Sequence, residues 1–165
     1  MPSTYSPILG IELIAPGEQN NTWGYTTNNN LGTLLEQAIA GQASIVMTTA
    51  SHTLTNIQGT TDEARCAILN VSGVLSVTGT IICPAVTKMY VVANNTSGGY
   101  DIEIKTAAGL GVLVPNGTVK IVFCDGVAEV SAQHVGVNLI DALDVVWFNI
   151  ASFLFPSFGR LKVRV

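Results

Sequence analysis

Hydrophobic and polar positions divide the chain into three stretches with different patterns. Between residues 43 and 132, short apolar runs recur at fairly even spacing, with Gly, Asn and Pro between them. Residues 100–105 show the pattern most clearly, because apolar and charged side chains alternate there at every position, as in a half-buried strand. Roughly eight or nine such runs, separated by turn residues, predict a mainly β domain that is an antiparallel β-sandwich or jelly-roll-like fold over residues 43–132.

Residues 1–42 predict an extended arm, a polar loop and one short helix. Three prolines in residues 1–16 disfavour a helix there, so this piece is expected to be an arm or an edge strand. Residues 17–30 are rich in Asn, Gly and Thr, which predicts a loop that carries Trp23. The apolar residues of 31–41 recur at helical spacing, with Asn30 as the predicted N-cap and Gly41 as the predicted left-handed stop.

The third stretch, residues 133–165, is an apolar tail. Leu139, Leu143, Val146, Ile150 and Phe153 stand four and three residues apart in turn, which is the spacing of a coiled-coil seam. Polar residues interrupt the run and leave apolar pieces shorter than the ~20 residues that span a bilayer, so no membrane span is expected. A helix at a subunit interface is the favoured interpretation. Strands in a shared core and contact with a membrane are the alternatives.

The composition favours a chain that packs against other chains. Hydrophobic residues make up 48% of the sequence and charged residues only 11%, against roughly 25% in soluble domains. The formal net charge is −4 and no basic run occurs, which argues against a nucleic-acid partner. The first residues lack the pattern of a signal peptide, so we expect synthesis and folding in a reducing cytoplasm.

No constellation in the sequence carries chemistry. The three cysteines, Cys66, Cys83 and Cys124, have no metal-ligand spacing and are expected to be small buried hydrophobes. His52 and His134 each lack a second ligand at metal spacing, and neither a nucleophile elbow nor a P-loop occurs. The acidic pair at 62–63 predicts a turn, and the one at 101 and 103 a solvated strand face. We therefore expect no catalytic, cofactor-binding or metal-ligating residue and no enzyme activity.

Apolar residues in the first and third stretches are the candidate interface. A large aromatic side chain in a polar loop gains a few kcal/mol when it is buried, and another subunit can bury it. The helix and the tail present further apolar stripes. The candidate contact residues are Trp23, Tyr25, Leu31, Leu34, Leu35, Ile39, Leu143, Val146, Trp147, Ile150 and Phe153.

Several of these segments together resemble a family of tailed-bacteriophage virion proteins of the tail fibre or tail structural type. The resemblance covers residues 8–130 and is carried by residues 17–19, 22–24, 26–28, 31–41, 61–65, 84–92, 114–117 and 122–126. It implies a homotrimer located in the virion and assembled in the host cytoplasm, with other phage proteins of the tail or the major capsid protein as partners. It carries over no catalytic residue.

After residue 130 the chain departs from the family, whose members often continue into long shafts or receptor-binding tips. A capsid decoration (cement) protein that stabilises the phage head is therefore an alternative. A second alternative is a carbohydrate-binding or glycan-hydrolysing module for host recognition, in which Trp23, Tyr25 and Tyr100 stack on sugars of a host surface glycan.

Overall fold

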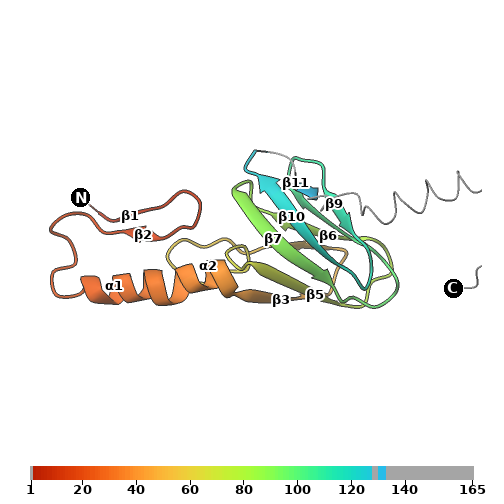
Figure 1. Ribbon diagram of the computed structural model, residues 1–165, viewed down its shortest axis with the longest axis horizontal. Helices are drawn as coiled ribbons and strands as arrows, with labels where there is room; N and C mark the ends of the chain where they lie inside the picture. Colours follow the sequence, from red (N-terminus) through yellow and green to blue (C-terminus); the bar gives the residue numbers. More distant parts are fainter. Residues whose placement is uncertain (1, 128–129, 133–165) are drawn as a thin grey trace, which may run out of the picture. The chain divides into compact units, whose positions relative to one another are not determined.

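Two β-sheets share one hydrophobic core in the computed structural model, which describes residues 2–127 and 130–132 (Figure 1). One sheet has five strands in the order β11-β10-β7-β5-β3, and the other has four in the order β4-β6-β8-β9. The five are β3 (Gln42–Met47), β5 (Ile68–Gly73), β7 (Thr87–Asn94), β10 (Val119–Asp125) and β11 (Val130–Ala132). The four are β4 (Ser51–Thr53), β6 (Gly79–Cys83), β8 (Ile102–Thr106) and β9 (Val112–Val114). The predicted mainly β character is confirmed.

The sheets are mixed, so the prediction of antiparallel sheets is wrong: four of the seven strand pairings described in the two sheets are parallel. The chain alternates between the sheets, from β3 to β4, from β5 to β6 and from β7 to β8. Each return adds one parallel strand to each sheet. We call each run of the chain through both sheets a pass. The pairs Ile68 with Val91 and Gly79 with Ile102 have equal sequence separations, so the second and third passes pair in the same register in both sheets. Within the described parts of these two sheets, β10 pairs antiparallel with β7 and with β11, and β9 pairs antiparallel with β8. The sandwich or jelly-roll designation stays a prediction.

The core lies between the two sheets and follows the alternation read from the sequence. Ile102 and Ile104 of β8 face inward and are fully buried, as are Tyr90 and Val92 of β7. The prediction for the cysteines is also confirmed, because all three are free and buried.

One continuous helix precedes the sheets and begins earlier than predicted. It consists of α1 (Trp23–Asn29), a π-helical middle, η1 (Asn30–Leu35), and α2 (Glu36–Ala40). The predicted loop over residues 23–30 is therefore wrong. Asn30, at the end of this stretch, is buried and hydrogen-bonded to Glu12 of the arm, and tertiary contacts of this kind override the weak helix propensity of Asn, Gly and Thr. Gly41 is not left-handed either: its backbone is extended, and a Cβ there would lie 2.5 Å from the carbonyl oxygen of Gln37.

The arm, residues 2–16, folds back as a small antiparallel hairpin of β1 (Thr4–Tyr5) and β2 (Glu12–Leu13). Asn30, predicted as the N-cap, lies inside the helix and holds this hairpin. Its side-chain amide donates to the carbonyl oxygen of Glu12 (2.8 Å), and its Oδ1 accepts from the Glu12 amide (3.2 Å). The amide of Gly59 donates to the carbonyl oxygen of Gly10 (2.8 Å), which joins the arm to the loop before β5. Arm, helix and sheets thus belong to one compact unit.

Candidate functional site

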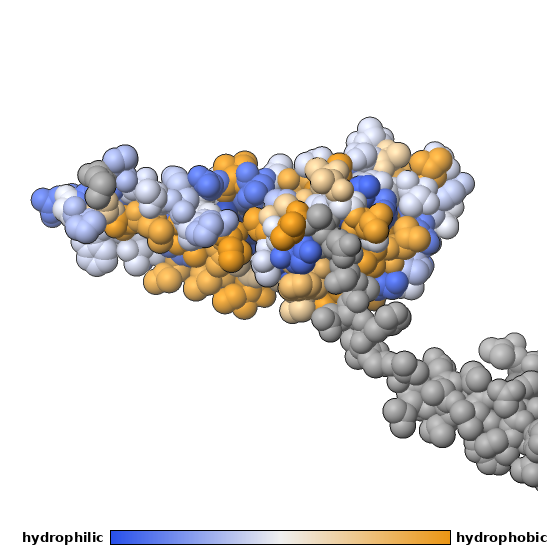
Figure 2. All heavy atoms as spheres, turned by 90° about the horizontal axis from the view of Figure 1, so that it is seen from above, coloured by the Kyte–Doolittle hydropathy of each residue, from blue (hydrophilic) through white to orange (hydrophobic). Residues whose placement is uncertain are grey.

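The helix carries an apolar stripe that no other described part of the chain covers. Trp23, Leu31 and Ile39 are exposed by 59%, 59% and 71%, and Leu35 between them is half-buried. We call these four residues the helix stripe. Figure 2 shows one face of the molecule, with apolar surface over the arm and helix region as well as over the strands. Exposed large apolar side chains gathered on one element mark an interaction surface.

The π-helical middle explains how these residues stay on one face. Positions 23, 27, 31, 35 and 39 are four residues apart, and four residues of an α-helix advance about 40° beyond a full turn. Such a stripe would drift around the helix. The wider turn of η1 (Asn30–Leu35), in which hydrogen bonds run from i to i+5, offsets this drift. The π-helical stretch therefore keeps Trp23, Leu31 and Ile39 closer to one face than a continuous α-helix would.

The structure sorts the residues predicted to form an interface. Tyr25 also lies on α1 and is 79% exposed, whereas Leu34 of η1 is fully buried inside the chain and is not available to a partner. The residues predicted from the tail lie outside the described residues, so their interface role stays a prediction; they are Leu143, Val146, Trp147, Ile150 and Phe153. The four-residue spacing of Trp23, Thr27 and Leu31 was the signal that could have extended the helix to Trp23.

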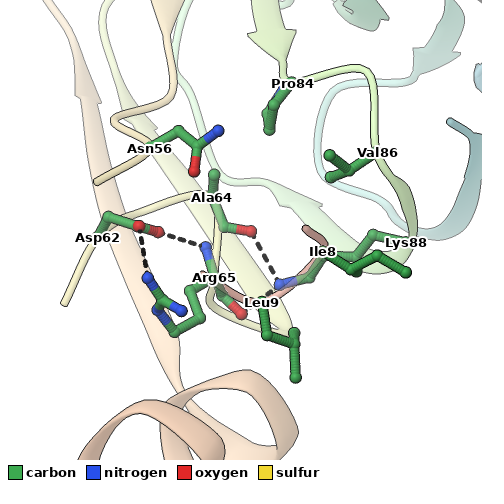
Figure 3. Close-up of a pocket in the computed structure, with 9 residues that line it drawn as sticks. All are labelled: Ile8, Leu9, Asn56, Asp62, Ala64, Arg65, Pro84, Val86 and Lys88. Atoms are coloured by element: carbon green, nitrogen blue, oxygen red, sulfur yellow. Dashed lines mark hydrogen bonds and ion pairs between the residues drawn. The ribbon is translucent and has the colours of Figure 1, made fainter. Parts of the chain in front are cut away.

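A buried ion pair fixes the loop that connects β4 to β5 (Figure 3). Asp62 accepts from the Arg65 guanidinium (3.0 Å), from the Arg65 amide (2.6 Å) and from the Ile57 amide (2.8 Å). The same guanidinium nitrogen, Nη2, donates to the carbonyl oxygens of Ile57 and Thr60. Asp62 therefore organises a turn, as the sequence predicted. The buried Arg65 side chain stabilises the same turn through its hydrogen bonds to the backbone of Ile57 and Thr60.

Lys88 completes this charged cluster from β7. Its ammonium group donates to the carbonyl oxygens of Ala64 (2.8 Å) and Arg65 and lies 5.0 Å from the ring centroid of Tyr90. Burial lowers the pKa of Lys88 to about 8. The adjoining cavity has a volume of about 10 Å³, which is room for one water molecule and not for a substrate. The cluster is thus built to hold a loop in place.

A second pair of ionisable side chains, His52 and Glu63, also serves local structure. His52 Nε2 lies 2.9 Å from the Glu63 carboxylate, which also accepts from the Thr55 amide. Burial alone would raise the pKa of Glu63, but the hydrogen bonds from Thr55 and His52 lower it. Within residues 2–127 and 130–132, no group of three His, Cys, Asp or Glu side chains is placed to hold a metal ion.

The three aromatics considered for sugar stacking lie on different elements. Trp23 and Tyr25 are in the first turn of α1, and Tyr100 is in the loop between β7 and β8. Since β7 runs parallel to β3, whose first residue follows the helix, this loop lies at the end of the five-stranded sheet away from the helix. The structure therefore does not bring Tyr100 together with the other two.

Comparison with protein-family models, with curated proteins and with solved structures finds no significant match. In the part of the chain that the structure describes, no helix is long and apolar enough to cross a membrane.

Proposed function

We propose that the chain is a structural subunit of a bacteriophage virion, a tail fibre or tail adaptor component that assembles as a homotrimer and performs no catalysis. The observation that carries the proposal is the helix stripe, an uncovered apolar row on a helix about 27 Å long. The likeness of residues 8–130 to tailed-phage virion proteins supports the same conclusion, as does the low content of charged residues.

In the trimer, the three copies of the helix stripe pack against one another around a threefold axis and bury their apolar side chains. Full burial of a Leu or Ile side chain stabilises by about 1.5–3 kcal/mol, so each helix gains several kcal/mol from a stripe of four residues. Identical subunits that pack through the same patch form closed, symmetric oligomers. The arm lies beside the helix and, repeated three times, supplies multivalent attachment to a neighbouring virion protein.

The mass of the purified protein, measured by light scattering, tests the trimer. The wild-type protein should have the mass of three chains, and Leu31→Glu should shift it to one chain, because a carboxylate cannot be buried in an apolar seam without a partner. Leu110→Glu is the matched control, since Leu110 is 76% exposed in the loop between β8 and β9. A wild-type monomer, or equal effects of the two variants, would contradict the proposed assembly.

Labelling of intact virions with an antibody to this chain tests the location. Label confined to the tail supports the tail fibre or adaptor, whereas label over the whole head would identify a capsid decoration protein instead. A glycan array adds the third outcome, because specific binding to a host glycan would favour the host-recognition module.

A further inference from the structure

Two of the three cysteines meet inside the core from opposite sheets. Cys83 is the last residue of β6 in the four-stranded sheet, and Cys124 is the next-to-last residue of β10 in the five-stranded sheet. Both side chains are no more than 2% exposed and belong to the same hydrophobic cluster. Three strands separate the two cysteines along the chain, so the sequence gives no sign of this pairing.

The contacts of the two thiols place their sulfur atoms at the same end of the core. The Cys124 thiol donates to the carbonyl oxygen of Pro84 (3.7 Å), the residue that directly follows Cys83. Cys124 therefore reaches across the core to the strand end that carries Cys83. The Cys83 thiol donates to the carbonyl oxygen of Lys105 (3.3 Å) on the neighbouring strand, β8. Burial raises the pKa of the Cys83 thiol, and the adjacent Cys124 thiol raises it further.

The third cysteine is engaged elsewhere. Cys66 Sγ accepts from the side-chain amide of Gln37 (3.3 Å), and its thiol donates to the carbonyl oxygen of Asp62 (3.6 Å). These contacts hold it between the helix and the loop before β5. Cys66 is equally buried and also free, so it serves as an internal control for the other two.

Both members of the pair stand where a strand ends. Cys83 is followed by Pro84, and Cys124 is followed by Asp125 and the turn at Gly126, whose φ is +87°. A disulfide bond needs two sulfur atoms that approach to about 2.05 Å, with a specific torsion about the bond. Strand ends open locally more readily than strand centres, which lets the side chains turn toward each other and lets a small reagent enter.

We propose that Cys83 and Cys124 form an intrachain disulfide bond when the folded protein meets a hydroperoxide, and that this bond cross-links the two sheets. One thiolate attacks the peroxide, the O–O bond breaks, and a sulfenic acid and hydroxide form. The second thiolate attacks the sulfenic sulfur, so that the S–S bond forms and the S–O bond breaks with loss of hydroxide. The two hydroxides take up the two thiol protons. Two thiols and one hydrogen peroxide thus give one disulfide and two water molecules.

The closed core keeps the pair reduced until it opens. The thiolate is the reacting form, and burial disfavours it, so the reaction follows local opening and the two thiols persist in a reducing compartment. The cross-link then distinguishes protein that has met an oxidant from newly made protein. The proposal goes beyond the proposed function and does not depend on the trimer or on a virion.

Thiol alkylation followed by intact-mass spectrometry tests the proposal. The folded wild-type protein is treated with hydrogen peroxide, unfolded in guanidinium chloride and alkylated with iodoacetamide. It should carry one alkyl group, and three after prior reduction with dithiothreitol. Fragmentation of the tryptic peptide 66–88 should place the single group on Cys66. This readout uses the wild type alone and does not rely on a variant that folds.

Three variants assign the bond. Cys66→Ala should carry no alkyl group after peroxide, and its non-reduced tryptic digest should join residues 66–88 to residues 121–160. Cys83→Ala and Cys124→Ala should form no disulfide. The oxidised wild type should also unfold at a urea concentration higher by about 1–2 M than the reduced protein, because the cross-link restricts the unfolded chain. Peroxide should not raise the midpoint of Cys124→Ala.

The oxidant needs its own control, which Met89 supplies. Its side chain is 59% exposed, so its conversion to the sulfoxide shows that peroxide reached the protein. Three alkylatable thiols in wild-type protein whose Met89 is fully oxidised would overturn the proposal. A disulfide that includes Cys66, or one that joins two chains on a non-reducing gel, would overturn it as well.

Discussion

The buried pair of Asp62 and Arg65 gives the sharpest quantitative prediction. The two side chains are exposed by only 1% and 3%. Arg65→Met removes hydrogen bonds to Asp62, Ile57 and Thr60 and leaves the Asp62 carboxylate buried with backbone amides as its remaining donors. Removal of one partner of a buried ion pair costs about 3–5 kcal/mol. For a chain of this length, about 2–4 °C per kcal/mol puts the loss in Tm at roughly 6–20 °C.

A double-mutant cycle in urea separates the ion pair from simple loss of packing. The double variant Asp62→Asn, Arg65→Met should be more stable than the sum of the two single changes predicts, because no charge remains buried without a partner. Two guanidinium nitrogens of Arg65, Nε and Nη1, have no hydrogen-bond partner; Arg65→Met and the double variant both remove this cost, so it cancels from the coupling energy. Lys105→Met, on the solvent-facing side of β8, is the control and should stay within about 0.5 kcal/mol of the wild type.

The reasoning fails if Arg65→Met costs less than about 1 kcal/mol, or if the two single changes add without coupling. Either result would mean that other contacts hold the loop before β5 and that the ion pair contributes little to the stability of the protein.

Two further predictions concern glycine and pH. Gly98→Ala should destabilise by at least about 2 kcal/mol more than Gly99→Ala in urea unfolding. Both glycines have positive φ, but only a Cβ at Gly98 would meet the Leu75 carbonyl oxygen, at 2.0 Å, so equal losses would contradict the geometry. Since burial lowers the pKa of Lys88 from 10.5 to about 8, the unfolded chain binds the extra proton between these values. The stability of the wild type relative to Lys88→Met should therefore rise from pH 8 to pH 10 in the same assay, and a flat or falling difference would refute the pKa.

The alternation of apolar and polar residues predicted which side chains enter the core and could not predict how strands pair. Ile102 and Ile104 face inward whether β8 has parallel or antiparallel neighbours, because side chains alternate in both. Parallel pairing depends on the chain crossing to the other sheet between β3 and β5, and that route leaves no local trace in the sequence.

For the helix, even the secondary structure could be predicted only in part. Its second half was readable from the spacing of Leu31, Leu35 and Ile39, whereas its first half, rich in Asn and Thr, reads locally as a loop. What makes it helical is contact with the arm, seen in the hydrogen bonds between Asn30 and Glu12. The interface stays a prediction. Among its candidate residues on the helix, Trp23, Tyr25, Leu31 and Ile39 are exposed and Leu35 is half-buried, whereas Leu34, at the same helical spacing, packs inside the chain.

The stacking of passes from β3 and β4 through β5 and β6 to β7 and β8 makes this fold extensible by units. Each pass contributes one strand to each sheet and one layer to the core between them, so a whole pass can be inserted or lost without changing which side chains face inward. Every such unit would change the length of the stack by about 4.8 Å. A scaffold of this kind lets the width of the two sheets, measured across the strands, change in fixed increments, while the length along the strands stays the same.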